Sequence, residues 1–204
     1  FYDYIHSMPE LKSEKILISV FNYLFKNVYT LSEPKYRPKD LSAYLEYRCL
    51  AKIRQAAEVN DEIRSILGYN KLLINGQEYE NIPYVINQIK QSSSLKKTLA
   101  TYRMCSIHGD TTIDNILASK KTDDFLLIDP TDNENEISGP VFDFGRMTQS
   151  LRYGYEFLCR DDQQVNIDGN NINFEYSLSK NYAKLYETQK KLQKKFLTSE
   201  EQSS

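Results

Sequence analysis

The residues whose side chains could most clearly take part in a chemical reaction lie in one short stretch of the chain. His108-Gly109-Asp110 is followed five residues after the aspartate by Asn115, and Asp129 closes the apolar run 125–128. A carboxylate on a tight loop can accept a proton from a hydroxyl group. A side-chain amide and a second carboxylate supply oxygen atoms, which are the ligands that Mg²⁺ prefers. The spacing therefore predicts a site for metal-assisted phosphoryl transfer to a hydroxyl.

The elements around these residues are predicted to bring them together. Residues 116–118 read as a short strand, 120–123 as a turn, and 125–128 as a second strand that ends at Asp129. A carboxylate at the last residue of a buried strand points from the sheet edge into a cleft. A helix near 140–159 is indicated by apolar residues at helical spacing, namely Phe144, Met147, Leu151, Tyr155 and Leu158.

Three segments carry a resemblance to a known family. They are the run from His108 to Leu117, then Leu127-Ile128-Asp129, and then Gly139-Pro140-Val141-Phe142-Asp143. Over about 106–150 the chain resembles the C-terminal lobe of the aminoglycoside phosphotransferase and choline kinase family, which are protein-kinase-like phosphotransferases. The resemblance implies a small-molecule kinase with ATP and Mg²⁺ as cofactors.

The resemblance also implies a role for each residue. Asp110 would orient or deprotonate the acceptor hydroxyl, and His108 would brace the catalytic loop rather than react. Asn115 and Asp129 would be the Mg²⁺ ligands and so the cofactor-binding residues. Asp143 would be a buried support that accepts hydrogen bonds from backbone N–H groups near His108 and Gly109.

The triplet Asp143-Phe144-Gly145 spells the metal-binding D-F-G motif of protein kinases. We nevertheless expect Asp129 to be the metal ligand, because it directly follows the strand. Asp143 falls inside a helical pattern, where a buried side chain suits loop support better than metal binding.

The chain departs from the family pattern in three places. Thr111-Thr112-Ile113-Asp114 replaces a run that usually contains Pro or Gly, and Pro130 follows Asp129. The third departure is larger, since no G-x-G-x-x-G loop and no V-A-I-K-like strand occurs anywhere in the sequence. We therefore expect a C-terminal lobe whose nucleotide-binding N-lobe is absent from this chain.

The expected fold is α+β and mainly helical, a protein-kinase-like C-lobe over 1–197 with short β-hairpins around the catalytic loop. The catalytic loop would span 106–118, the metal strand 124–130, and the polar tail 198–204 would be disordered. Two further hairpins are expected at 72–79 and 165–174, and they either wall the acceptor cleft or decorate the surface. Other helices are expected at about 9–28, from Asp40, from Asn60, at about 83–99 and at about 178–196.

Composition narrows the choice of partners. The 204 residues carry 26 basic and 28 acidic side chains, a net charge of −2, which gives no bulk attraction to nucleic acid or anionic membrane. The sequence shows neither a signal peptide nor an apolar run near 18 residues. Cys49, Cys105 and Cys159 are odd in number and unpaired in spacing, as is usual in a reducing compartment. We expect a cytoplasmic protein whose partners are a small-molecule acceptor, either a sugar or an amino alcohol, and the missing N-lobe.

Charge is unevenly distributed along the chain. Between Thr122 and Gly145 there are seven acidic residues and no Lys or Arg. This bias favours a divalent cation, although Asp132, Glu134 and Glu136 are equally well explained as a solvated loop. The last helix is rich in lysine, which usually marks a solvated helix face.

Three alternative interpretations remain open. The chain could be a catalytically silent, pseudokinase-type interaction module or an inactive fragment, as the missing phosphate loop suggests. It could be a metal-dependent phosphoesterase that uses Asp110, Asp129 and Asp143, although such sites often need more histidine than the two present. A Cys105–His108 nucleophilic pair is the weakest alternative, because residues three apart at such a turn rarely face each other.

Overall fold

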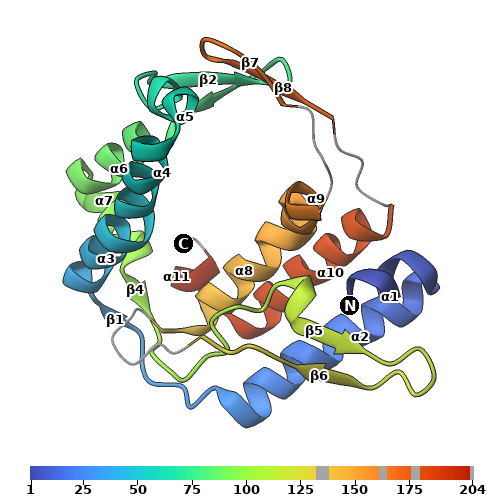
Figure 1. Cartoon of the computed structure of the whole chain (residues 1–204). Helices are drawn as coiled ribbons and strands as arrows, with labels where there is room; N and C mark the ends of the chain where they lie inside the picture. Colours follow the sequence, from blue (N-terminus) through green and yellow to red (C-terminus); the bar gives the residue numbers. More distant parts are fainter. Residues whose placement is uncertain (132–137, 161–164, 176–179, 203–204) are drawn as a thin grey trace. The chain divides into compact units, whose positions relative to one another are not determined.

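The computed structural model describes residues 1–131, 138–160, 165–175 and 180–202 (Figure 1). These residues are mainly helical with a few short strands, which confirms the predicted α+β class. The chain divides into two compact units, Phe1–Lys35 with Thr101–Asp161 and Ser177–Ser204, and Tyr36–Ala100 with Asp162–Tyr176. The single lobe predicted over 1–197 thus spans two compact units, and the second set of helices and hairpins packs mainly on itself.

The first unit contains the predicted catalytic loop. Its elements are α1 (Tyr2–Ser7), α2 (Glu10–Tyr23), the π-helical turn η1 (Leu24–Val28), the 3₁₀ turn η3 (Ile113–Asn115), β5 (Ile116–Ala118), β6 (Phe125–Leu127), α8 (Pro140–Tyr153), α9 (Tyr155–Arg160), α10 (Lys180–Phe196) and α11 (Ser199–Gln202). The short strands β1 (Lys35–Tyr36) and β4 (Thr101–Tyr102) lie where the chain passes between the units.

The core of this unit forms where α10 packs against both α2 and α8 (Figure 1). Leu17, Val20 and Phe21 of α2 are fully buried, and the rings of Phe21 and Phe144 stack with centroids 4.2 Å apart. Tyr182 and Leu185 of α10 are likewise completely buried. Burying one such side chain stabilises the fold by about 1.5–3 kcal/mol, so this layer gives α8 a fixed position from which to hold the loop.

The hairpin after the catalytic loop forms as predicted. β5 and β6 pair antiparallel, with Ile116 opposite Leu127 and Ala118 opposite Phe125. One more backbone bond extends the ladder, because Ile128 N donates to Asn115 O at 3.0 Å. This register places the end of the predicted metal strand directly beside η3.

The second unit contains α3 (Pro38–Tyr44), the π-helical turn η2 (Leu45–Leu50), α4 (Ala51–Val59), α5 (Asp61–Ile66), β2 (Lys71–Ile74), β3 (Gln77–Glu80), α6 (Ile82–Gln91), α7 (Ser93–Leu99), β7 (Val165–Asp168) and β8 (Asn171–Phe174). Both predicted hairpins are present, and they share one four-stranded sheet in the order β3-β2-β8-β7. The central pair is parallel, with Leu73 opposite Asn171. Sequence reasoning found each hairpin but not this pairing, which has no local signal.

Two predicted helices are interrupted by capping residues. The helix expected at 83–99 is split at Ser92, whose hydroxyl accepts a hydrogen bond from Leu95 N and so starts α7. The helix expected near 140–159 ends its first part at Gly154, which adopts a left-handed conformation with φ 63°. No helix in the described ranges is long and apolar enough to cross a membrane.

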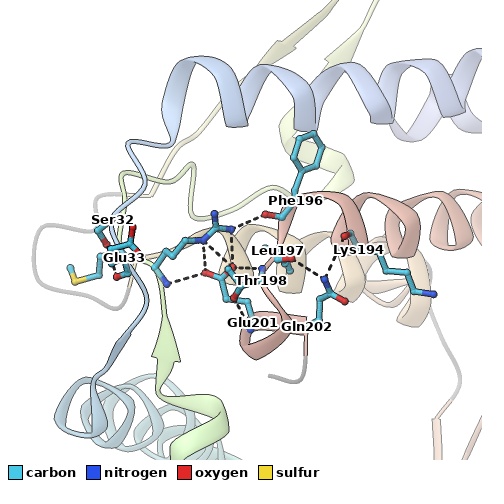
Figure 2. Close-up of polar contacts among 10 residues, drawn as sticks. Ser32, Glu33, Lys194, Phe196, Leu197, Thr198, Glu201 and Gln202 are labelled. Carbon is cyan, nitrogen blue, oxygen red and sulfur yellow. Dashed lines mark hydrogen bonds and ion pairs between the residues drawn. The ribbon is translucent and has the colours of Figure 1, made fainter.

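A buried ion pair holds the C-terminal helix α11 (Figure 2). The Glu201 side chain is fully buried and that of Arg103 is 14% exposed. Arg103 Nη2 donates to Glu201 Oε2 at 2.8 Å and to Phe196 O at 2.7 Å, and Arg103 N donates to Glu201 Oε1 at 2.9 Å. Thr198 N donates to the same carboxylate at 3.0 Å, which caps the helix. These bonds tie α11 to the chain just before the catalytic loop.

Within the tail predicted to be disordered, 198–204, the structure has the helix α11 with Thr198 before it, and 203–204 lie outside the described residues. The polar residues that suggested disorder include Glu201, whose buried carboxylate accepts hydrogen bonds from four N–H groups. Burial raises the pKa of Glu201, but the hydrogen bonds from Arg103 and the backbone lower it by more, so its pKa lies below the ordinary value of 4.5.

We predict that Glu201→Gln lowers the free energy of unfolding by about 3 kcal/mol, the low end of the cost of removing one partner of a buried pair. Because the folded-state pKa of Glu201 is lowered, the carboxylate stabilises the fold above pH 4.5 and this contribution is lost as the pH falls through that lowered pKa. The difference in free energy of unfolding between wild type and Glu201→Gln should thus become smaller at acidic pH. Urea denaturation at several pH values measures both effects.

Glu10→Gln is the matched control, since Glu10 forms an exposed 3.8 Å pair with Lys184. Exposed pairs contribute about 0–1 kcal/mol, so this variant should stay close to wild type. If the two substitutions lower the free energy of unfolding equally, the ion pair at α11 stabilises the fold no more than an exposed pair does.

Candidate active site

The catalytic loop is held from below by the Asp143 carboxylate. Asp143 lies in the first turn of α8 and is fully buried. Its Oδ2 accepts a hydrogen bond from His108 N at 3.0 Å, and its Oδ1 accepts one from Gly109 N at 2.7 Å. These are the two backbone groups that the sequence analysis assigned to it. Gly109 has φ 81°, a conformation that favours glycine, so the turn presents both N–H groups to one carboxylate.

Tyr29 completes this support and was missed in the sequence. Its hydroxyl donates to Asp143 Oδ2 at 2.7 Å, from a position 114 residues earlier in the chain. Burial raises the pKa of Asp143, and the hydrogen bonds from Tyr29, Gly109 and His108 only partly offset that rise. Burial and the nearby Asp143 charge also raise the pKa of Tyr29, so Tyr29 remains a donor.

A second buried carboxyl fixes the far end of the loop. Ile113 N, at the start of η3, donates to Ser150 Oγ at 3.1 Å and to Glu156 Oε1 at 3.2 Å. The Ser150 hydroxyl donates in turn to Glu156 Oε1. Glu156 is fully buried on α9, and burial raises its pKa above the ordinary value. The loop is therefore fastened to two successive helices.

Between these two supports, Asn115 and Asp110 are joined directly. Asn115 Nδ2 donates to Asp110 O and to Asp110 Oδ2, both at 2.8 Å. This uses both N–H bonds of the amide, so Asn115 Oδ1 is the atom that can bind a cation. The Asp110 side chain is 33% exposed, and its Oδ1 lies 3.5 Å from Arg146 Nε of α8. The carboxylate is thus positioned by its neighbours yet open to solvent.

Asp129 follows β6 and lies beside the same loop. The residues around it are tied down on both sides, since Ile128 N bonds to Asn115 O at 3.0 Å and Thr131 N bonds to His108 O at 2.9 Å. Asp129 itself is exposed and has φ 52°, a left-handed conformation that is uncommon for residues other than glycine, although Asp adopts it more often than most. Strained residues that are held by their surroundings often mark functional sites.

His108 and Cys105 lie close to Asp110 but show no nucleophilic arrangement. His108 is buried, and its Nδ1 accepts a long hydrogen bond of 3.4 Å from Asp110 N, as expected of a bracing residue. Burial is the main cause that raises the pKa of Cys105 to about 12, so the reactive thiolate is not formed near neutral pH. The Cys105–His108 alternative is therefore unsupported.

The described residues contain no group of three or more His, Cys, Asp or Glu side chains placed to hold a metal. Asp143 is committed to three hydrogen bonds, which removes it from the ligand set that a phosphoesterase would need. Asn115 and Asp129 remain as the two expected oxygen donors, and the bond from Ile128 N to Asn115 O brings the residue before Asp129 next to Asn115. Mg²⁺ keeps several waters, so it needs few protein ligands. Asp132, Glu134 and Glu136 of the acidic segment lie outside the described residues.

Sequence reasoning missed Arg146, Tyr29, Ser150 and Glu156. Arg146 had a usable signal, because it follows Asp143 by three residues on a predicted helix and so shares its face. Glu156 also had one, as an acidic residue between apolar positions of the same helical pattern. Tyr29 had none, since nothing local distinguishes it from the other 15 tyrosines.

Comparisons with protein-family models, curated proteins and solved structures gave no match for this chain.

We predict that Asp143→Asn lowers the free energy of unfolding by about 1–3 kcal/mol, the cost of an unsatisfied buried polar group. In either orientation the new NH₂ group faces a backbone N–H donor of His108 or Gly109. Urea denaturation measures the loss. Asp124→Asn is the control, because Asp124 is exposed and the change should stay within about 0.5 kcal/mol. A fully stable Asp143→Asn protein would contradict the proposed support.

Glu156→Gln should remove a pH dependence rather than the loop support. The raised folded-state pKa of Glu156 means that wild-type stability falls as the pH rises from 4.5 to that pKa, because the folded state holds the proton more tightly. The amide oxygen can accept from Ile113 N and from the Ser150 hydroxyl, as the carbonyl oxygen of a neutral carboxyl would. The free energy of unfolding of the variant minus that of wild type should therefore rise with pH over this interval.

Glu156→Ala, which leaves Ile113 N with fewer acceptors, should be destabilised at every pH. Taking the difference between variant and wild type cancels the slope from Asp143, whose pKa is also raised. A flat difference curve would show that Glu156 keeps its ordinary pKa.

Proposed function

We propose that this chain is the acceptor- and metal-binding part of an ATP-dependent phosphotransferase that moves a phosphoryl group to a hydroxyl of a small molecule. The observation that carries the proposal is the bond pair from Asn115 Nδ2 to the backbone and the carboxylate of Asp110. It sets a proton acceptor beside an amide oxygen that can bind a cation. The sequence motif and the buried Asp143 support the same reading.

In this proposal Asp110 binds the acceptor hydroxyl. Its carboxylate is partly exposed, so a hydroxyl can reach it at hydrogen-bond distance. The two buried carboxyls, Asp143 and Glu156, keep the backbone on either side from moving. Catalysis of phosphoryl transfer rests mainly on positioning, so a rigid loop is the contribution that this chain can make.

Asn115 Oδ1 and the Asp129 carboxylate would hold Mg²⁺. When bound, the ion neutralises charge on the phosphate oxygens of the nucleotide. Arg146 is a further cation at the site, 3.5 Å from Asp110 Oδ1. It can move from that carboxylate to an incoming phosphoryl oxygen, because an arginine side chain binds both groups with the same N–H donors.

The nucleotide would be covered by a lobe that this sequence does not encode. No Gly-rich loop and no V-A-I-K-like strand occurs among its 204 residues. The acceptor is a sugar or an amino alcohol in the proposal, since both offer a hydroxyl group. The same missing loop favours the second candidate function, a catalytically silent interaction module, in which Asp110 and Asn115 serve only to stabilise the loop.

The test is transfer of labelled γ-phosphate from ATP to a panel of sugars and amino alcohols, with Mg²⁺ omitted as a control. It should be run on this chain and on the same chain extended toward its N-terminus. We expect Asp110→Asn to lower kcat by about 10²–10⁴-fold, the usual contribution of a general base. Asp129→Asn should raise the Mg²⁺ concentration needed for half-maximal rate.

Asp124→Asn is the matched control, an exposed carboxylate at the other end of the same hairpin, and it should keep wild-type turnover. A protein that binds Mg²⁺-ATP but transfers no phosphate to any acceptor would favour the silent module. Turnover that survives loss of both Asp110 and Asp129 would overturn the proposed roles.

A further inference from the structure

A groove of about 640 Å³ runs along the face between α8 and α10, away from the catalytic loop. These two helices pack side by side in the first unit (Figure 1). The groove is lined by Leu151 and Arg152 of α8 and by Lys180, Tyr186, Glu187 and Lys190 of α10. Its volume is in the range of small-molecule sites, about 300–1,000 Å³.

The groove concentrates positive charge in a chain whose net charge is negative. Among the described residues, Arg152, Lys180 and Lys190 line it with one carboxylate, Glu187, so three cations accompany one anion. Glu187 is committed to Lys190, with Oε1 and Nζ 2.6 Å apart. Within the described residues, neither Arg152 nor Lys180 forms an ion pair with a carboxylate. Cations gathered without enough counter-charge favour an anionic ligand.

Tyr186 positions two of these cations. The Arg152 guanidinium lies 5.9 Å from the centroid of the Tyr186 ring, and the Lys190 ammonium lies 5.2 Å from it. Cations at such distances are attracted to the ring. The ring therefore holds two long side chains, one from each helix, in the same groove, which lowers the entropic cost of binding a ligand there.

The length of the cationic row indicates what the ligand must carry. Lys180 and Lys190 are ten residues apart on α10, about 15 Å along the helix axis, with Arg152 approaching between them. A single phosphate cannot contact both ends at once. Arginine binds phosphate oxygens with paired N–H donors, and lysine binds them as a compact charge.

The geometry points to a binding site for a small ligand that carries two or more phosphate groups. This site is separate from Asp110, because Arg152 lies six residues beyond Arg146 on α8 and on a different side of that helix. It also gives a role to part of the lysine-rich last helix, which composition alone marks as a solvated face. Lys180 and Lys190 line the groove, whereas Lys191 and Lys194 are exposed on the same helix.

Binding of a sugar bisphosphate with its phosphates at opposite ends of the molecule tests the inference, by calorimetry and by NMR shifts of the α8 and α10 amides. The double variant Arg152→Gln/Lys190→Gln should weaken binding at least tenfold. The control Lys191→Gln/Lys194→Gln removes the same charge from the exposed face of α10 and should change affinity less than twofold. Melting curves must show both proteins folded.

Asp129→Asn should leave this binding intact, which separates the groove from the proposed Mg²⁺ site. The groove could thus be real even if phosphotransferase activity is absent. Equal weakening in the two double variants would overturn the inference in favour of non-specific attraction. Loss of bisphosphate binding in Asp129→Asn alone, no binding at millimolar bisphosphate, or binding only to anionic phospholipid vesicles would also overturn it.

Discussion

The structure of the loop at 106–118 depends on one carboxylate that accepts hydrogen bonds from two successive backbone N–H groups. Asp143 contacts His108 N and Gly109 N with its two oxygens, and both partners lie more than thirty residues earlier in the chain. A backbone N–H buried without a partner is costly, so the loop and the start of α8 cannot separate easily. This contact fixes the turn that directly precedes Asp110.

Burial of that carboxylate is itself unfavourable, and the neighbouring core makes it possible. Burial raises the pKa of Asp143, which means that the charged form is disfavoured relative to water. Three donors, two of them backbone groups that cannot move, offset much of this cost. The stacked rings of Phe21 and Phe144 hold α8 against α2, so Asp143 cannot swing out to solvent. Apolar packing thereby keeps a polar contact in place.

The sequence predicted the features that neighbouring residues determine. It did not predict the contacts between residues that lie far apart in the chain. The strands at 116–118 and 125–127, the hairpin turn at Asn75-Gly76 and the burial of Asp143 were all readable from spacing and residue type. Tyr29, the joining of two hairpins into one sheet, and the Arg103–Glu201 pair were not, because their partners lie about a hundred residues apart. Local polarity was misleading at Glu201, since a polar tail and a buried polar anchor have the same composition.

Several energetically unfavourable features gather at this loop, and they argue that its sequence was not selected for stability alone. Asp129 adopts a left-handed conformation directly before Pro130, a position where proline disfavours compact backbone, while Asp143 and Glu156 are buried carboxyls with raised pKa values. A turn selected for stability alone would use Gly or Asn at residue 129 and apolar residues beneath it. Instead, an exposed carboxylate is kept at a strained position by hydrogen bonds on both sides. Such costs are tolerated where the surrounding structure holds a side chain in one conformation, and here the backbone bonds of Ile128 to Asn115 and of Thr131 to His108 provide that support.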